Sequence, residues 1–549
     1  MIDGLVVGFA EAFQIWNLLM MAGGVFAGLV VGAIPGFSIT MAIVLVLPFT
    51  YGMDAGAGLS LMIGVMVGGL SGGLISAMLI GIPGTPASVA TTFDGLPMVR
   101  SGRQGFALGL GIWSSAIGGL LSGLALLVLS PYLARIGLEI GPWDYFMMIV
   151  FALTITASLS GDNMVKGLLA GAFGLLIAAV GEEQVNGVSR LTFGNRSLDG
   201  GFDYLPILIG VFAFSQLLLD MPSRYVARRS LSTNSEAGSQ HIPHLLAIRT
   251  ILKNWRTTIR STLIGLFVGI LPATGASISN IIAYDQAKKA SLNPKEFGKG
   301  AVEGIIAPET SNNATQGGSL MILMALGIPG DAVAAVVLAA LLIHDVAPSP
   351  TFILEQPAIA YLIFVTFIVA HVVMVVMQSI TLRVFVMCIR VPIYILVAII
   401  LFYCAMGVFS VNNTMFDVWT MFLFGVVGYI MARANFPLAP LILGVVLGTI
   451  AEVNLIRAMS INSDIVVFVT RPWSLLFLVL AVLSVLFPIY QNRRDAIWGP
   501  YFLPVAAILV GIPIAIMPGL IRPAIAVLIA ALGIYHLYRA MSHSPKHRT

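Results

Sequence analysis

Fourteen apolar stretches follow one another along this chain, and they restrict its possible folds more than any other feature. Each approaches or exceeds the roughly 20 residues that a helix needs to cross a hydrocarbon core about 30 Å thick. The composition also fits a lipid environment, because 58% of the residues are hydrophobic, only 9% are charged, and the mean hydropathy is +0.99. The sequence therefore predicts an all-α polytopic membrane protein with about 12–14 membrane segments.

A short motif, Gly-Ile-Pro-Gly, occurs twice, at Gly81–Gly84 and at Gly327–Gly330. Two further blocks, at 28–35 and 206–211, also have counterparts roughly 240 positions later in the chain. The three blocks keep one order and nearly one separation. The chain is therefore predicted to contain two duplicated halves.

Basic residues indicate how the halves are oriented. The polar stretch 221–260 carries seven Arg and Lys against the single acid Glu236, so it is predicted to lie in the cytoplasm. Residues 1–99 contain no Lys or Arg, which favours an external N-terminus. These two positions require an odd number of crossings between them, so we expect inverted structural repeats. The net charge of +4 comes from loop residues and does not indicate a nucleic-acid partner.

We expect four parts along the chain. They are a first transmembrane repeat at 1–220, a cytoplasmic basic linker at 221–258, a second transmembrane repeat at 259–460 and C-terminal peripheral transmembrane helices at 461–549. Both repeats are predicted to contain broken helices or re-entrant hairpins, because Gly and Pro interrupt their apolar stretches.

Polar residues cluster directly after these interruptions. A broken membrane helix frees backbone NH and CO groups, which persist only where protein or a watery cavity surrounds them. Half-helix N-termini suit a carboxylate, and the opposing carbonyl groups suit a sodium ion. The predicted substrate-binding residues are Ser38, Thr40, Thr85, Ser88, Thr274, Ser277, Asn280, Asn312, Asn313 and Thr315. The predicted ion-coupling residues are Gly36, Gly84, Asn313 and Asp331.

These assignments have structural alternatives. A Ser or Thr hydroxyl often bonds to the backbone one turn back in a membrane helix. Glu309 and Asp331 are candidates for ionisable groups with a function at membrane depth, and the alternative is that they cap the aqueous end of a helix. Asp94 and Asp285 lie beside basic loops and are interpreted as solvated loop charges.

Enzyme chemistry has weak support in this sequence. Residues 69–73 read Gly-Leu-Ser-Gly-Gly, which fits the Gly-x-Ser-x-Gly pattern around serine nucleophiles. The candidate bases His344 and His371 have no recognisable partner motif, and a chain with 57 glycines contains such strings by chance. Cys388 and Cys404 are interpreted as core thiols. We expect no enzyme activity, no cofactor and no metal other than a coupling sodium ion.

Several long motifs of this chain resemble one family, the large membrane subunit of the tripartite tricarboxylate transporters. The resemblance spans about residues 15–460. The motifs that carry it are Gly28–Gly36, Ser71–Pro86, Asp94–Met98, Leu271–Ala276, Tyr284–Lys289 and Ala307–Ala314.

The resemblance implies a secondary importer, with sodium as the expected coupling ion. It also implies a small membrane subunit of four helices and a periplasmic solute-binding protein that delivers a carboxylate such as citrate. The expected location is the bacterial cytoplasmic (inner) membrane. The alternatives are a passive channel, a membrane scaffold without coupled transport, and, with weaker support, an intramembrane serine protease.

Overall fold

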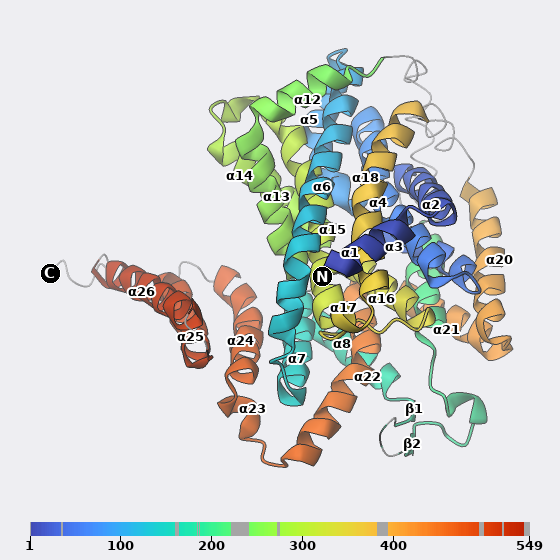
Figure 1. Cartoon of the computed structure of the whole chain (residues 1–549), viewed down its shortest axis with the longest axis vertical. Helices are drawn as coiled ribbons and strands as arrows, with labels where there is room; N and C mark the ends of the chain where they lie inside the picture. The colour runs from blue at the N-terminus through green and yellow to red at the C-terminus, as the bar shows by residue number, and fades with distance from the viewer. Residues whose placement is uncertain are drawn as a thin grey trace. The chain divides into compact units, whose positions relative to one another are not determined.

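The computed structural model describes residues 2–34, 37–159, 164–183, 185, 187–220, 241–271, 275–381, 393–492, 499–518 and 521–542 (Figure 1). These residues are almost entirely helical, which confirms the predicted all-α class. In one polar loop, β1 (Gly181–Glu182) pairs with β2 (Ser189–Arg190) in an antiparallel ladder. The sequence gives little signal for strands this short, because two residues cannot establish an alternating pattern.

Seven described helices are long and apolar enough to cross a membrane. They are α2 (Ile15–Ala33), α4 (Ala55–Ile80), α6 (Gln104–Gly137), α18 (Pro357–Ile380), α21 (Met415–Arg433), α22 (Leu438–Ile461) and α24 (Pro472–Asn492). Shorter apolar helices of 10–17 residues accompany them. The chain is therefore a multi-pass membrane protein, and the number of crossings stays a prediction.

The helices form two compact units, and each unit draws on both predicted halves of the chain. One unit comprises Met1–Gly137 and Phe202–Ala434, and the other comprises Leu138–Gly201 and Asn435–Thr549. The four predicted parts divide the chain by sequence order, so their boundaries stay predictions. Within the predicted linker, 221–240 lie outside the described residues, while a helix already forms at His244–Lys253.

The first unit contains α2, α4, α6, α18 and α21 together with most of the shorter helices. These are α1 (Ile2–Ala12), α3 (Ile39–Thr50), η1 (Pro86–Ser88), α5 (Val89–Arg100), α9 (Tyr204–Leu208), η3 (Ile209–Phe214), α10 (Ser215–Asp220), α12 (His244–Lys253), α13 (Trp255–Ile270), α14 (Gly275–Ala290), η5 (Pro294–Glu296), α15 (Glu303–Leu326), α16 (Ala332–Ile343), α17 (Phe352–Glu355) and α20 (Ile393–Asn412).

Glycines set the close packing of α2 against α4. A Cβ atom added to Gly28 would lie 2.3 Å from the carbonyl oxygen of Val65, and one added to Gly32 would lie 2.3 Å from that of Gly69. In return, a Cβ on Gly68 would lie 2.2 Å from the carbonyl oxygen of Val25. Such spacing of small residues lets two membrane helices approach backbone to backbone.

The packing of α13 against α15 has the same character. Added Cβ atoms on Gly265 and Gly269 would lie 2.4 and 2.1 Å from the carbonyl oxygens of Ser311 and Thr315. The α2–α4 and α13–α15 pairs carry the block at 28–35, the two Gly-Ile-Pro-Gly ends and the counterparts of that block, so two of the three duplicated blocks are matched by similar local packing.

Each Gly-Ile-Pro-Gly motif ends a long helix in the same way. Gly81 follows α4 with φ 76° and ψ 13°, and Gly327 follows α15 with φ 74° and ψ 15°. This left-handed conformation favours glycine, and the proline two residues later prevents the helix from continuing. In addition, α3 of the first half packs against α16 of the second half, and α5 of the first half packs against α14 of the second half. Helices next to the breaks thus contact each other across the two halves. The inversion of the two halves stays a prediction.

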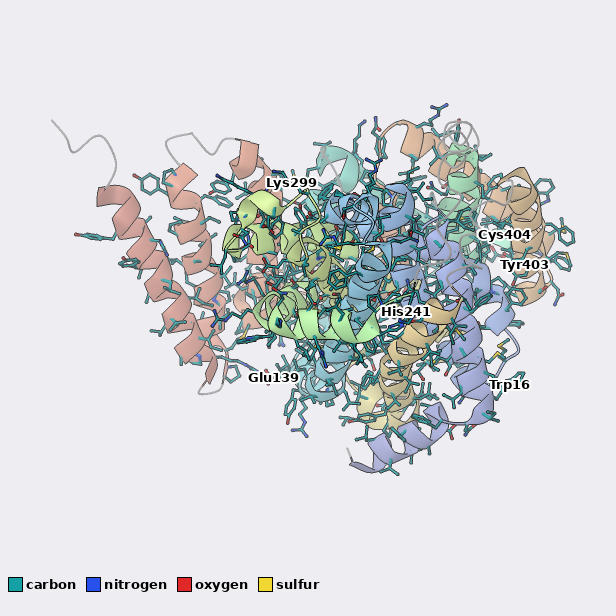
Figure 2. All side chains as sticks on the ribbon, turned by 90° about the horizontal axis from the view of Figure 1, so that it is seen from above. Trp16, Glu139, His241, Lys299, Tyr403 and Cys404 are labelled. Carbon is teal, nitrogen blue, oxygen red and sulfur yellow. The ribbon has the colours of Figure 1, made fainter. Side chains whose placement is uncertain are left out.

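The second unit packs α7 (Pro142–Leu159) and α8 (Met164–Ala178) against α22 and α24. Its remaining elements are β1, β2, η2 (Arg196–Leu198), α23 (Val467–Thr470), α25 (Gly499–Ile516) and α26 (Ile521–Ser542). Arg471 contacts the buried carboxylate of Asp144, with an Nη2–Oδ2 distance of 2.8 Å. Arg522 pairs with Glu139, which is labelled in Figure 2, and its hydrogen bond lowers the pKa of that carboxyl.

Candidate functional site

One face of α15 carries four buried polar side chains. Glu309, Asn312, Asn313 and Gln316 are spaced as i, i+3, i+4 and i+7, which places them on the same side of a helix. All four are at most 1% exposed. The helix is surrounded by α5, α6, α13 and α14, so these polar groups lie inside the first unit.

Glu309 contacts the two helices that follow the first break. Its carboxylate accepts hydrogen bonds from Thr91 Oγ1 of α5 at 2.5 Å and from Ser115 Oγ of α6 at 2.8 Å. Both donors are neutral hydroxyls, and no described basic side chain forms an ion pair with this carboxylate. An ionisable group at this depth is a candidate for ion or substrate coupling.

The other polar atoms on this helix are only partly satisfied by the protein. Asn313 Nδ2 donates to the Glu309 carbonyl at 3.2 Å, while its Oδ1 has no partner. Neither polar atom of Asn312 has a partner, and the same is true of Gln316 Oε1 and Thr310 Oγ1. Five of the sixteen such buried atoms among the described residues thus belong to α15. A buried polar group left without a partner costs about 1–3 kcal/mol, so this concentration indicates a place where something polar binds.

Asp331 contacts the C-terminal end of this polar face, at Gln316. Its carboxylate accepts hydrogen bonds from Gln316 Nε2 at 3.0 Å, from Ser319 Oγ at 3.2 Å and from the Ala334 NH at 2.8 Å. It therefore caps the N-terminus of α16, as the structural alternative supposed, but it is only 6% exposed and does not lie at an aqueous helix end. Capping and burial together fix the turn after the second Gly-Ile-Pro-Gly motif.

The glycine that ends each Gly-Ile-Pro-Gly motif lies against the closely packed glycines of a helix pair, α2–α4 for Gly84 and α13–α15 for Gly330. A Cβ on Gly84 would lie 2.1 Å from the Gly32 carbonyl oxygen, and one on Gly330 would lie 2.4 Å from that of Gly269. Gly84 also donates its NH to the Gly73 carbonyl at 3.3 Å. The backbone of each break thus lies against a long helix, where only glycine leaves enough room.

Thr85 and Ser88 lie directly after the first break and are buried. Their hydroxyl oxygens are 3.3 Å apart, and both face Gly73 of α4, which has no side chain to displace them. They lie at η1, which packs against α14 and α15. The structure thus brings these two predicted residues to the surroundings of the α15 polar face.

The other predicted residues are placed in different ways. Ser38 caps α3 by accepting from the Met41 NH at 3.0 Å, and Thr40 is buried on that helix. Ser277 is exposed on α14. Thr315 Oγ1 lies 2.8 Å from the Ser311 carbonyl of its own helix, the local bonding expected of a structural hydroxyl, and 2.6 Å from Ser279 Oγ of α14. Gly36 and Thr274 lie outside the described residues.

Asn280 connects α14 to α5, the helix that follows the first Gly-Ile-Pro-Gly break. Its Oδ1 accepts from the Ala90 NH of α5 at 3.2 Å, and its Nδ2 donates to two carbonyls of its own helix, those of Ala276 and Ser277. The amide is thus engaged on both its oxygen and its nitrogen. Its role in substrate binding stays a prediction, whereas its role in joining α14 to α5 is visible.

The interpretation of Asp94 as a solvated loop charge is wrong. Asp94 is fully buried, and its Oδ1 accepts three backbone hydrogen bonds, from Gly298 and Gly300 at 2.8 Å and from Ala301 at 2.7 Å. Its Oδ2 accepts from the Tyr284 hydroxyl at 2.9 Å. The charge is stabilised by donors at least 190 positions away, which the neighbouring basic residues in the sequence do not reveal. Asp285, in contrast, is half exposed and pairs with Lys289.

Thr91 and Ser115 are site residues that the sequence prediction omits. Thr91 follows the first break by only a few positions, so its sequence position did offer a signal. Ser115 lies within an unbroken helix, and only its contact with Glu309 shows its place.

The serine of the nucleophile-like string, Ser71, is buried, and its Oγ bonds to no described histidine. Cys404 is a buried free thiol on α20 beside Tyr403 (Figure 2), whereas Cys388 lies outside the described residues.

Helices broken at duplicated motifs around a buried polar face are typical of membrane transporters. Comparison with known proteins defines the family within this class. Residues 18–443 match the Tripartite tricarboxylate transporter TctA family, and the chain belongs to this family. The family is one of transporters with partner subunits, including a solute-binding protein.

Two relatives come from Agrobacterium vitis. One, described as an uncharacterized 52.8 kDa protein in the TAR-I ttuC' 3'region, is 32% identical over 503 residues, which cover 91% of this chain and 99% of the relative. The other, an uncharacterized protein in the TAR-II ttuC' 3'region, is 34% identical over 238 residues, or 43% of this chain and 98% of the relative. No solved structure matches the chain.

Proposed function

We propose that this chain is the transport subunit of a binding-protein-dependent secondary transporter that imports carboxylates of the citrate type, coupled to sodium. The observation that carries the proposal is the set of unpartnered buried polar atoms on α15, the helix that ends at the second Gly-Ile-Pro-Gly break. Amide groups can bind a carboxylate or donate an oxygen to sodium without the cost of burying a further charge.

The division of this face suggests two kinds of ligand. Asn312 offers both a donor and an acceptor, which suits a carboxylate group of the substrate. The oxygens of Asn313 and Gln316 have no donor, and with the Glu309 carboxylate they form an oxygen-rich face suited to a cation. No described group of three or more His, Cys, Asp and Glu residues converges as a metal site, so the oxygens proposed for sodium come mostly from neutral groups.

The proposed partners are a small membrane subunit of four helices and a periplasmic solute-binding protein, in the cytoplasmic membrane of a bacterium. The transporter family supports this assembly. The alternative of a passive channel or scaffold predicts flux, or an assembly role, that needs neither a cation gradient nor the binding protein.

Uptake of a labelled carboxylate into vesicles that contain all three subunits tests the proposal. We expect uptake only with a sodium gradient and the binding protein. Asn312→Ala and Asn313→Ala should raise the half-saturating substrate or sodium concentration roughly tenfold, the equivalent of about 1–3 kcal/mol. Thr85→Ala and Ser88→Ala should lower uptake at an unchanged amount of membrane protein.

Asn454→Ala is the matched control, because Asn454 donates only to its own helix, to the Ile450 carbonyl at 2.8 Å. It should leave both half-saturating concentrations unchanged. Unchanged values in both the Asn312 and Asn313 variants would show that this face is not the binding site. Flux without sodium or binding protein would instead support a channel.

A further inference from the structure

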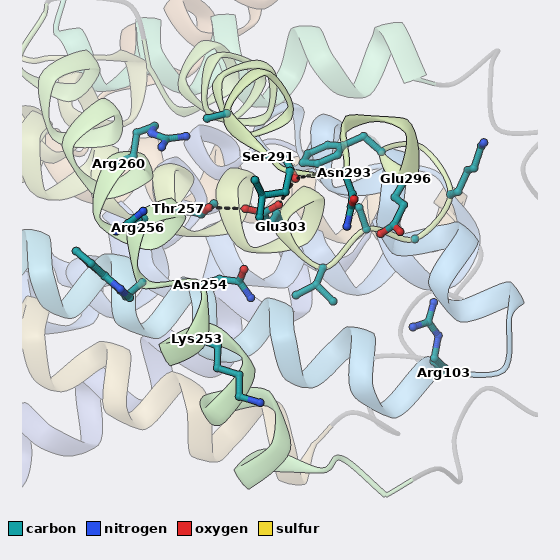
Figure 3. Close-up of a pocket in the computed structure, with 18 residues that line it drawn as sticks. Arg103, Lys253, Asn254, Arg256, Thr257, Arg260, Ser291, Asn293, Glu296 and Glu303 are labelled. Atoms are coloured by element: carbon teal, nitrogen blue, oxygen red, sulfur yellow. Dashed lines mark hydrogen bonds between the residues drawn. The ribbon is translucent and has the colours of Figure 1, made fainter.

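A pocket of about 840 Å³ opens in the first unit, apart from the α15 polar face. Its walls are the end of α12, the start of α13, the end of α14 and the loop 290–303 that leads into α15. Figure 3 shows Glu303 between Thr257 and Ser291, whose hydroxyls both donate to its carboxylate, with Thr257 at 2.8 Å. This carboxylate thus links α13, the loop after α14 and the start of α15 at the pocket wall.

The pocket is rich in positive charge. Arg103, Lys253, Arg256, Arg260 and Lys299 line it, against the carboxylates of Glu296 and Glu303. None of the five cations forms a described ion pair with either carboxylate. The pocket thus has an excess of three positive charges, which favours an anionic ligand.

Exposed apolar side chains continue from the pocket along α13. Trp255 lines the pocket and is 53% exposed, and Ile259, Leu263 and Phe267 follow at intervals of four residues, each at least 45% exposed. Leu292, in the loop after α14, also lines the pocket and is 97% exposed. In a membrane protein, a stripe of this kind faces lipid tails. A cationic pocket thus lies at the end of an apolar track.

We propose that this pocket binds the phosphoryl headgroup of an anionic phospholipid, whose acyl chains lie along the apolar stripe of α13. The ligand chemistry follows from the two parts of the surface, because a soluble anion would use the cations and leave the stripe without a role. The volume lies within the range of about 300–1,000 Å³ found for small-molecule sites. Basic residues beside a membrane helix attract anionic headgroups in this way.

Fluorescence quenching tests the proposal, because Trp255 lies at the junction of pocket and stripe. The full chain in detergent is titrated with phosphatidylglycerol carrying brominated acyl chains, and the signal of a Trp255→Phe variant is subtracted to isolate Trp255 from the other six tryptophans. We expect saturable quenching, with at least tenfold weaker binding of brominated phosphatidylcholine. Lys253→Gln with Arg256→Gln should weaken phosphatidylglycerol binding about 30-fold, given about 1 kcal/mol for each basic residue near an anionic surface.

Arg249→Gln with Lys288→Gln is the matched control, because it removes the same charge from exposed positions on α12 and α14 that do not line the pocket. This variant should bind like the wild type. Inorganic phosphate separates the two sources of the anion. Weak competition by phosphate supports a lipid, whereas full displacement at equal concentration would show that the pocket recognises free phosphate. Equal binding of both lipids, or equal loss in the two double variants, would overturn the proposal.

Discussion

Replacement of Asn312 by leucine should stabilise the protein and abolish its function at the same time. Asn312 is fully buried on α15, and neither Nδ2 nor Oδ1 has a hydrogen-bond partner. A buried amide without partners costs about 1–3 kcal/mol, and Leu has nearly the same size and shape without the polar atoms. We therefore expect Asn312→Leu to raise the free energy of unfolding by about 1–3 kcal/mol, while sodium-driven uptake is lost.

Asn280→Leu is the control, because it should lower the free energy of unfolding where Asn312→Leu raises it. This amide accepts from the Ala90 NH and donates to two carbonyls, so its replacement leaves a backbone NH of α5 buried without a partner. The expected loss of stability is about 1–3 kcal/mol. The same chemical change at two buried asparagines should thus shift stability in opposite directions.

The measurement is the midpoint of thermal unfolding of the purified chain in detergent without substrate, together with uptake in reconstituted vesicles. A rise for Asn312→Leu, a fall for Asn280→Leu, and loss of uptake in Asn312→Leu would support a site that keeps unsatisfied groups for its ligand. A similar fall in both midpoints would refute the argument from unpartnered atoms, and normal uptake in Asn312→Leu would refute the position of the site.

Two other substitutions test the surroundings of the site. Gly84→Ala and Gly330→Ala should each cost about 1–3 kcal/mol and reduce uptake, because the new Cβ meets a backbone carbonyl. A Cβ added at Gly23 would meet no atom within 4 Å, so Gly23→Ala should leave thermal stability unchanged or slightly higher. Equal effects at all three glycines would show that close packing at Gly84 and Gly330 does not set their cost. Asp94→Ala should lower stability by at least about 2 kcal/mol through the loss of its backbone donors, whereas Asp285→Ala should change it by less than about 1 kcal/mol. Similar midpoints for the two aspartate variants would show that the Asp94 contacts contribute little.

Local features of this chain could be predicted from its sequence. The left-handed glycines after α4 and α15 follow from the repeated Gly-Ile-Pro-Gly letters, and the polar character of α15 is plain from residues 309–316. Glycine and proline restrict their own backbone, so their effect needs no knowledge of distant residues.

Features that depend on distant partners could not be predicted in this way. Three of the four donors to Asp94 are backbone NH groups of a loop in the other half, and any residue type except proline can supply those. The division of the chain into two units likewise depends on which helix faces pack together, and apolar stretches look alike in sequence whichever neighbour they meet. For the same reason, Ser115 is indistinguishable in sequence from the other small residues of α6.

The three-residue spacing of Thr91 and Asp94 on α5 has a mechanical consequence. Thr91 holds the Glu309 carboxylate, and Asp94, one turn further on, holds the NH groups of Gly300 and Ala301, which form part of the pocket wall. A displacement of α5 along its axis would therefore change both places together. Binding at either place that favours one position of this helix would alter affinity at the other by the same factor, as thermodynamic reciprocity requires.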